Sequence, residues 1–311
     1  NTGAALEFSS LELNKVSSCF FNLNSAETNE DIQEIAREFS PKLTAFSSET
    51  LLNEPLFLRI QSVYESGQEL HSAEAKRLLN ETYESFVRNG AALVGENRTR
   101  LTALNEELST LSLTFGEHVL AETKAFQYHT SRSEDLQGLP EDVIESAAQL
   151  AQQQGKEGYL LGLDMPTYMA VMKYADRSEL RAHFYRAYGS RAAKENENNN
   201  EQVIKDVVNK RMERAQLLGF DSHAQLTLSK RMAKTPRTVL NFLDHLLEVA
   251  KPAAELDLNA VTEFSVSQGA DLPVQPWDFS YWSEKLKMER LSLDDQALKP
   301  YFKLENVLEG A

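Results

Sequence analysis

Histidine is the side chain in this sequence best suited to hold a metal ion or to move a proton near neutral pH. The zinc helix of a metal-dependent hydrolase carries two histidines four residues apart, because that spacing puts both imidazoles on one helix face. No two of the six histidines have this spacing; they are His71, His118, His129, His183, His223 and His245. Glu117-His118 supplies only half of such a motif. We therefore interpret His118 as a packed or partly exposed side chain rather than a metal ligand.

Other residue types that carry chemistry also form no complete motif. The chain has no GxxxxGK[ST] phosphate loop, no GxGxxG dinucleotide fingerprint and no GxSxG nucleophile turn. Cys19 is the single cysteine, which excludes a zinc site made of cysteines and an intrachain disulfide. Because it lies in the run of residues 16–21, we predict a small buried hydrophobe. Neighbouring carboxylates such as Glu106-Glu107 and Glu141-Asp142 are better explained by solvation and helix dipoles than by catalysis.

The most unusual local composition is the segment 276–285, PWDFSYWSEK, which holds both tryptophans of the chain. If Asp278 caps a helix, Tyr281 follows at its third position, with Trp282 and Lys285 aligned along the same helix. One interpretation is a helix start fastened into the core by aromatic packing, which we favour, and the other is a face that contacts a ligand. The residues of this segment that could form such a face are Trp277, Asp278 and Tyr281.

A short stretch contains four arginines, at positions 177, 181, 186 and 191. Arg177 and Arg181 are four residues apart, so a helix would place both on one face, where they could hold an anionic ligand. Because Asp176 and Glu179 are close neighbours, we interpret these arginines as surface ion pairs instead.

Helices must position these residues, because apolar residues recur with helical spacing along most of the chain. The stripe from Leu101 to Val119 steps by three or four residues and predicts a long amphipathic helix. Pro140 opens another helix, which Gly155 ends, and a further helix ends at Gly219. Pro252 interrupts the apolar run that begins at residue 239, so we predict a kink or break there.

Strand signals are confined to one part of the sequence. The apolar run 157–163 is bounded by glycines and predicts a short strand, with which residues 128–131 could pair. We therefore expect an all-α, multi-helix protein with one small β-hairpin near residues 127–164. We expect two parts: an amino-terminal helical region over 1–126 and a second helical region over 127–311.

Composition excludes several classes of function. The 311 residues include 32 Lys+Arg and 47 Asp+Glu, giving a net charge of −15. This charge opposes binding to phosphate backbones and anionic lipid, so we expect neither a nucleic-acid nor a membrane partner. The lone cysteine and the absence of a secretory pattern near Asn1 favour a cytoplasmic location. Asn1 in place of Met suggests a processed or trimmed start.

Several segments, in order, resemble the thimet oligopeptidase and neurolysin family of zinc metallopeptidases. Residues 217–220 and 231–236 resemble the family's LLGF…MAKTP run. Residues 276–285 resemble its PWD..YYSEK segment, with Trp282 at the second aromatic position. Its KPYF…VL segment is matched by Lys299-Pro300-Tyr301-Phe302 and residues 306–308. Residues 20–26 and 104–110 are especially similar to bacterial peptidyl-dipeptidases, and residues 159–161 and 185–188 to oligopeptidase A.

The resemblance implies a mostly helical, two-lobed channel enzyme in which zinc cleaves short peptides. In this family the zinc helix lies well downstream of the KPYF segment, so its metal ligands, glutamate base and substrate-orienting residues match no position here. We expect the amino-terminal, channel-wall part of a peptidyl-dipeptidase or oligopeptidase. In such a wall, Trp277, Asp278 and Tyr281 would be the candidates for lining the substrate channel. Its parent would use zinc, whereas this part, lacking HExxH, would bind no metal and be inactive alone.

Two expectations concern partners. The parent would act on short peptides, and this part would pair with the missing carboxyl-terminal catalytic half. We expect an unpaired apolar surface between Trp277 and Leu308, through which the isolated chain would self-associate. The alternative is a stand-alone, non-catalytic α-helical module that binds another protein.

Overall fold

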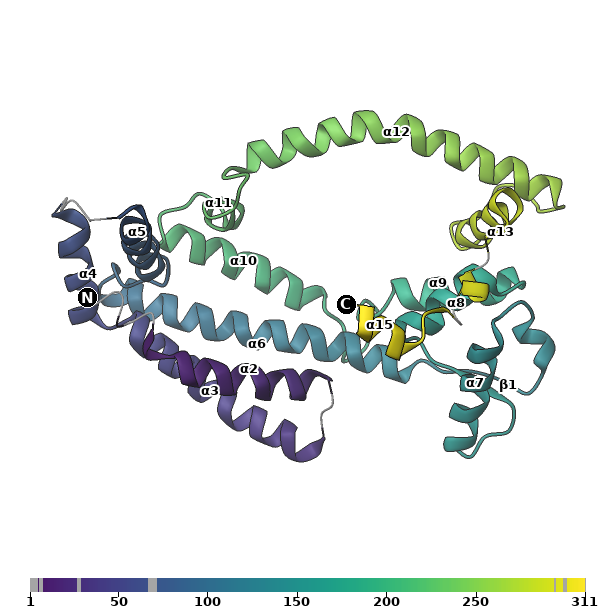
Figure 1. Ribbon diagram of the computed structural model, residues 1–311, viewed down its shortest axis with the longest axis horizontal. Coiled ribbons are helices and arrows are strands. Elements are labelled where there is room, and N and C mark those ends of the chain that lie inside the picture. The colour runs from purple at the N-terminus through teal and green to yellow at the C-terminus, as the bar shows by residue number, and fades with distance from the viewer. Residues whose placement is uncertain are drawn as a thin grey trace. The chain divides into compact units, whose positions relative to one another are not determined.

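The chain folds almost wholly into α-helices, with one two-stranded hairpin, as the sequence predicts (Figure 1). The computed structural model describes residues 5, 8–26, 29–66, 72–293, 295–298 and 301–310. His71, Lys299 and Pro300 lie outside these residues. The chain divides into two compact units, one of residues 1–108 with 210–230 and the other of 109–209 with 231–311. The division expected at residue 126 stays a prediction.

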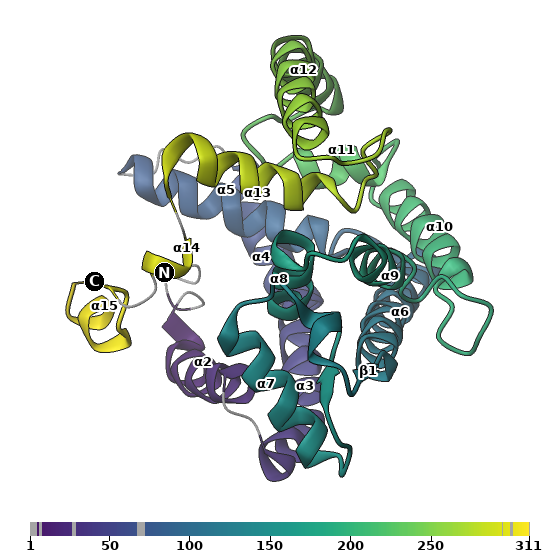
Figure 2. The ribbon, with the colours of Figure 1, turned by 90° about the vertical axis from the view of Figure 1, so that its right-hand side faces the viewer.

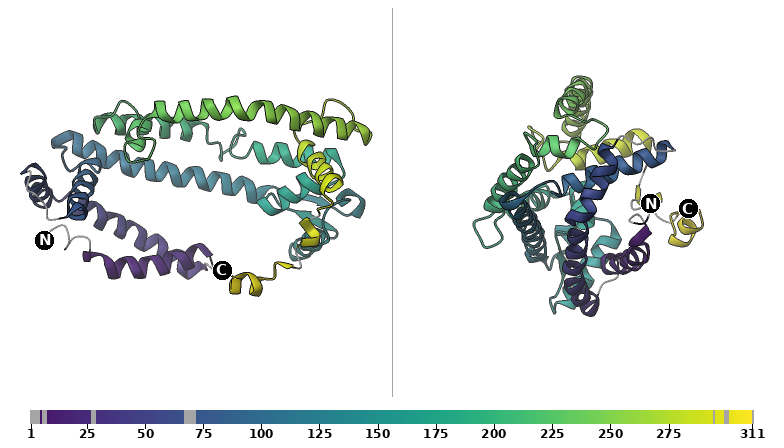
Figure 3. Two further views of the ribbon diagram at one scale, coloured as in Figure 1. Left: turned by 45° about the horizontal axis from the view of Figure 1, so that its top comes forward. Right: turned by 90° about the vertical axis from the view of Figure 1, so that its left-hand side faces the viewer.

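The first unit contains two helical pairs. Helices α2 (Leu11–Ala26) and α3 (Glu30–Leu51) run side by side, as the purple helices of Figure 3 show. Cys19 is exposed on α2, so its prediction as a buried hydrophobe is wrong. A lone helix pair buries only the face between its members, which leaves positions on the other face in solvent.

The core of the first unit lies between α4 (Glu54–Glu65) and α5 (Ala73–Arg88). Asn53 starts α4 by accepting the Leu56 amide on its side chain, which satisfies one of the free donors at a helix start. The buried residues of this core are Phe57, Ile60, Phe86 and Ala91. The unit also includes the start of α6 (Gly95–Ala125), the end of α10 (Glu201–Leu217) and the short α11 (His223–Leu228).

The core of the second unit is built around the hairpin. Strand β1 (Tyr128–Thr130) pairs antiparallel with β2 (Tyr159–Leu161), which confirms the pairing expected from the sequence. Helix α7 (Glu141–Gln153) packs on β2, and α8 (Met165–Tyr174) packs on α9 (Ser178–Gly189) (Figure 2). The buried residues of this core come from these elements, from the 3-10 turn Ser133–Leu136 and from the connections between them: Leu136, Leu139, Ala147, Leu161, Leu163, Val171, Ala175, Leu180 and Phe184.

The candidate residues lie at the start of the second of two further helices. Helix α12 (Pro236–Ser267) runs through Pro252 without a break and curves along its length (Figure 1), so the predicted break is not present and a kink at Pro252 stays a prediction. Helix α13 (Phe279–Leu291) packs on both α12 and α8. The short helices α14 (Asp295–Leu298) and α15 (Leu304–Gly310) follow.

Candidate functional site

The candidate residues converge on one buried arginine at the start of α9. Arg181 is only 2% exposed, although arginine is rarely buried unless it is paired. Its Nε and Nη2 donate hydrogen bonds to Asp278 Oδ1, at 3.1 and 2.5 Å. Its Nη1 donates to the backbone oxygens of Ala175 and Asp176, which end α8 and begin the connection to α9. The interpretation of Arg181 as a surface ion pair is therefore wrong.

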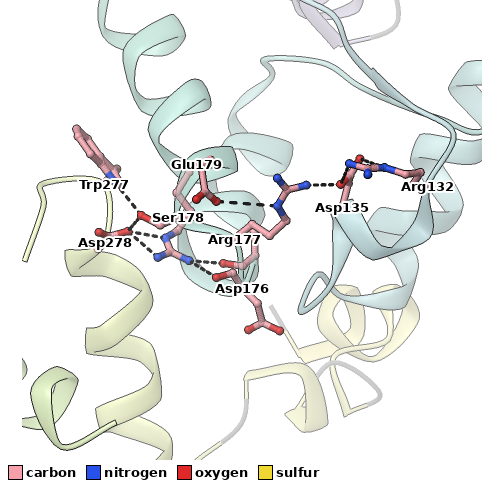
Figure 4. Close-up of polar contacts among 10 residues, drawn as sticks. Arg132, Asp135, Asp176, Arg177, Ser178, Glu179, Trp277 and Asp278 are labelled. Atoms are coloured by element: carbon pink, nitrogen blue, oxygen red, sulfur yellow. Dashed lines mark hydrogen bonds and ion pairs between the residues drawn. The ribbon is translucent and has the colours of Figure 1, made fainter. Parts of the chain in front are cut away.

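Asp278 lies at the N-cap position of α13, but its side chain accepts no hydrogen bond from the helix amides. Its Oδ1 instead accepts bonds from Arg181 and from the Ser178 hydroxyl, the latter at 2.7 Å (Figure 4). The capping role considered for Asp278 is therefore not the one it performs. The charged and hydroxyl donors of α9 compete successfully, because bonds to a charged donor are stronger than neutral ones.

Trp277 and Tyr281 fasten the same cluster from either side of Asp278. The Trp277 indole Nε1 donates to the Ser178 hydroxyl at 3.1 Å. The Tyr281 hydroxyl donates to Asp176 Oδ1 at 2.8 Å, and the Arg181 guanidinium lies 4.1 Å from the centre of the Tyr281 ring. Burial raises the pKa of Tyr281 above its ordinary value, and the bond to the Asp176 carboxylate adds to the rise. All three candidates thus bond to the α8–α9 junction.

A second charged group lies beside this cluster and joins the hairpin to α9. The buried Asp135 accepts hydrogen bonds from Arg132 and Arg177 (Figure 4), and a further one from the Thr130 hydroxyl. The Thr130 hydroxyl lowers the pKa of the Asp135 carboxyl most strongly, and the bond from Arg132 and the charges of both arginines lower it further. Arg177 therefore pairs with a buried acid of the turn after β1 as well as with Glu179, whose carboxylate is 4.0 Å away.

The cluster borders a cavity of about 680 Å³ on one face of α9. Of the three candidates, Trp277 lines it, together with Ser178 and Arg186. Asp278 and Tyr281 are both less than 10% exposed, so their polar atoms face protein partners. The structure brings the three candidates together around Arg181, and Trp277 alone reaches this open space.

Sequence reasoning missed Arg181, Ser178 and Asp135 as members of the cluster. A signal for Arg181 was present, because it lies between Leu180 and Ala182 and close to Phe184, all buried. Its partner Asp278 is 97 residues away, and no local pattern connects the two.

His118 also has a distant partner rather than a local one. Its Nδ1 lies 2.8 Å from Oδ1 of Asn200, which is 2% exposed. The Asn200 side chain also donates to the Phe115 oxygen, so it ties the loop before α10 to α6. The polar run 198–200 is of a composition typical of exposed turns, but Asn200 is buried.

The described residues do not fit a metal site. Among them, no three His, Cys, Asp or Glu side chains form a group that could hold a metal ion. No helix in the same part of the chain has both the length and the apolar character to cross a membrane.

Comparison with known proteins confirms the family resemblance. Residues 171–311 match the sequence model of peptidase family M3. The chain is 31% identical over 303 residues to oligopeptidase A of Haemophilus influenzae, covering 96% of this chain and 44% of that protein. It is 32% identical over 311 residues to dipeptidyl carboxypeptidase of Escherichia coli, covering 99% of this chain and 46% of the relative. The chain thus spans a little less than half the length of the relatives it matches.

Proposed function

We propose that this chain, similar over nearly its whole length to peptidases of family M3, is the amino-terminal, channel-wall part of a zinc peptidase that hydrolyses short peptides. The observation that carries the proposal is the similarity over 96 to 99% of the chain to two such peptidases. The parent activity would be of the oligopeptidase or peptidyl-dipeptidase type. We place it in the cytoplasm, where the single Cys19 would stay reduced.

In the parent peptidase, zinc would polarise the scissile carbonyl and activate a water molecule, and no group of the described residues fits that metal. The residues of this chain contribute shape and binding, and we assign no chemical step to them. The Arg181–Asp278 cluster fixes α13 against α8 and α9, so it would keep this wall rigid. We expect the chain alone to bind no stoichiometric zinc and to cleave no peptide.

Exposed apolar side chains support a partner for this wall. Along α12, Phe242, Leu247 and Leu256 are each at least 60% exposed. Between Trp277 and Leu308, where the sequence predicts an unpaired surface, Tyr281 and Leu286 are buried. Others are mostly exposed: Leu291, Tyr301, Phe302, Leu304 and Leu308. Such apolar surfaces mark interaction sites when they are contiguous. We propose that the catalytic half of the peptidase covers them.

Complementation tests the proposal. The chain would be co-expressed with the catalytic half from the parent reading frame, and cleavage of a quenched tetrapeptide measured with and without chelator. We expect chelator-sensitive cleavage only when both halves are present. Leu247→Glu, in α12, should weaken that recovery, whereas Glu248→Gln at the next position should not.

The same surfaces favour the second candidate, a stand-alone helical module that binds another protein. If the reading frame holds no zinc helix and the two halves neither associate nor cleave, the module becomes the better account. Zinc-dependent cleavage by the purified chain alone, after contaminating proteases are removed, would contradict both candidates.

A further inference from the structure

The cavity beside α9 contains features that the Arg181–Asp278 cluster does not use. Ser178, Ala182, Arg186 and Ser190 line it, and these residues recur every four positions along one face of the helix. Trp277, from the segment before α13, closes one side. The space of about 680 Å³ is large enough for a few amino-acid residues.

Arg186 is the notable side chain in this cavity. Its guanidinium lies 4.8 Å from the centre of the Trp277 ring, so the indole holds it in place by a cation–π contact. Within the described part of the chain, no carboxylate forms an ion pair with Arg186. Arg186 is exposed, so the donors of its planar guanidinium, which match a carboxylate, are open to an incoming ligand.

Lys194, the other lysine or arginine that lines the cavity, already has a carboxylate partner. Lys194 donates to the buried Glu122 at 2.6 Å. Glu179 lies 4.0 Å from the Arg177 guanidinium and seven residues before Arg186, which is about 10 Å along a helix. Arg186 is therefore the positive charge that an incoming anion would meet.

We propose that this cavity anchors a peptide through a carboxylate bound by Arg186, with Trp277 packing against the adjoining apolar side chain. The choice of a peptide as ligand rests on the proposed function. The carboxylate would come from the peptide's carboxyl terminus or from an acidic side chain. A guanidinium binds both in the same two-point manner.

Direct binding to the chain tests the site, with Trp277 fluorescence as the readout. Trp282→Phe removes the other tryptophan, which does not line the cavity. The probes would be acetyl-Ala-Ala-Phe with a free carboxylate, its carboxamide, and the carboxamide of acetyl-Ala-Glu-Phe. The variants would be Arg186→Gln, Arg186→Lys and, as the matched control, Arg237→Gln, which changes an exposed arginine on α12.

We expect the free acid to bind at least about tenfold more tightly than its amide, as for a lost charge-assisted hydrogen bond. Arg186→Gln should remove this preference, Arg186→Lys should retain part of it, and Arg237→Gln should keep it whole. Tight binding of the glutamate amide would identify a side-chain carboxylate as a ligand. Equal binding of the free acid and both amides, or equal affinity in Arg186→Gln and Arg237→Gln, would overturn the proposal.

This experiment is independent of hydrolysis. If complementation fails while carboxylate-dependent binding persists, the peptidase proposal fails and the site stands. If complementation succeeds while the Arg186 variants bind like the unaltered chain, only the site fails.

Discussion

Arg181 and Asp278 meet across 97 residues of sequence, with two guanidinium nitrogens directed at one carboxylate oxygen. Both residues are buried, at 2% and 9% exposure. A charge pair held in this way ties the start of α9 to the start of α13. Its disruption should therefore affect the whole second unit rather than one loop.

Replacing Arg181 by Met should lower the free energy of unfolding by about 3–5 kcal/mol, because it leaves the Asp278 carboxylate buried without its charge partner. The double variant Arg181→Met/Asp278→Leu should recover most of that loss, since neither charge then remains buried. Urea unfolding followed by circular dichroism measures both. Arg290→Met, at an exposed position of α13, is the control and should change stability by less than about 0.5 kcal/mol. A double variant as unstable as the single one would contradict the charge-pair explanation.

Gly158→Ala should destabilise the second unit, which contains the hairpin, more than Gly155→Ala does. Both glycines have positive φ, +88° and +67°, so alanine costs about 1–2 kcal/mol at either from backbone strain alone. A Cβ at Gly158 would lie 2.4 Å from the Thr130 oxygen and 2.7 Å from Ser131 Cα, whereas nothing lies within 4 Å at Gly155. Thermal unfolding of the two variants measures the difference. Equal melting temperatures would show that residues 130–131 move aside for the added Cβ at no cost, and would contradict the predicted clash.

His223 should make the first unit less stable in mild acid. Burial, followed by the charges of Arg211 and Arg214, lowers the pKa of this imidazole below its ordinary value of 6.5. The unfolded chain therefore takes up the proton first. The stability that depends on a neutral His223 is fully present above pH 6.5, and it is lost progressively as the pH falls from 6.5 toward the folded-state pKa of this imidazole.

His223→Met tests this pH dependence. His223 Nδ1 is buried and has no hydrogen-bond partner among the described residues. Its removal should therefore raise the free energy of unfolding by about 1 kcal/mol at pH 8. The gain should increase at pH 5.5, because the variant cannot take up the proton on unfolding. His245→Met, at an exposed position of α12, is the control and should leave the slope with pH unchanged. A gain that shrinks on acidification would reverse the assigned sign.

Asp135 should contribute to acid unfolding of the second unit. Since the Thr130 bond and the two arginines lower the pKa of this carboxyl below 3.8, its stabilising effect is present above pH 3.8. That effect is lost as the pH falls further, through the folded-state pKa. Asp135→Asn should therefore lose less stability than the unaltered chain between pH 5 and pH 2.5. The exposed Asp271→Asn should follow the unaltered chain, and identical acid profiles for all three would refute the role of Asp135.

The helices and the hairpin could be predicted from the sequence because their causes are local. The stripe from Leu101 to Val119 falls within α6, and the glycines at 155 and 219 follow the ends of α7 and α10. Trp277, Asp278 and Tyr281 stood out by composition, and they do gather in one cluster. Their use as channel lining stays a prediction.

The polar partners could not be predicted, because each depends on tertiary contact. Arg181 carries neighbouring acids at 176 and 179 that suggest a surface pair, yet the residue it bonds is Asp278. Asn200 is embedded in a polar run typical of an exposed turn, but His118 and Phe115 of α6 supply the partners for its amide. Helical periodicity shows which face of a helix is apolar. It does not show which distant polar group bonds to a polar residue on that face.

The discontinuous units impose an order on biosynthesis. Residues 1–108 belong with 210–230, so the first unit is complete only after the intervening 101 residues have been translated. At about 5–20 residues per second, the ribosome spends roughly 5–20 s on that stretch. During this interval the early helices lack their last segment, and the core of Phe57 and Phe86 must form without α11. Chaperone binding to the nascent chain should therefore be greatest between the synthesis of residues 108 and 230.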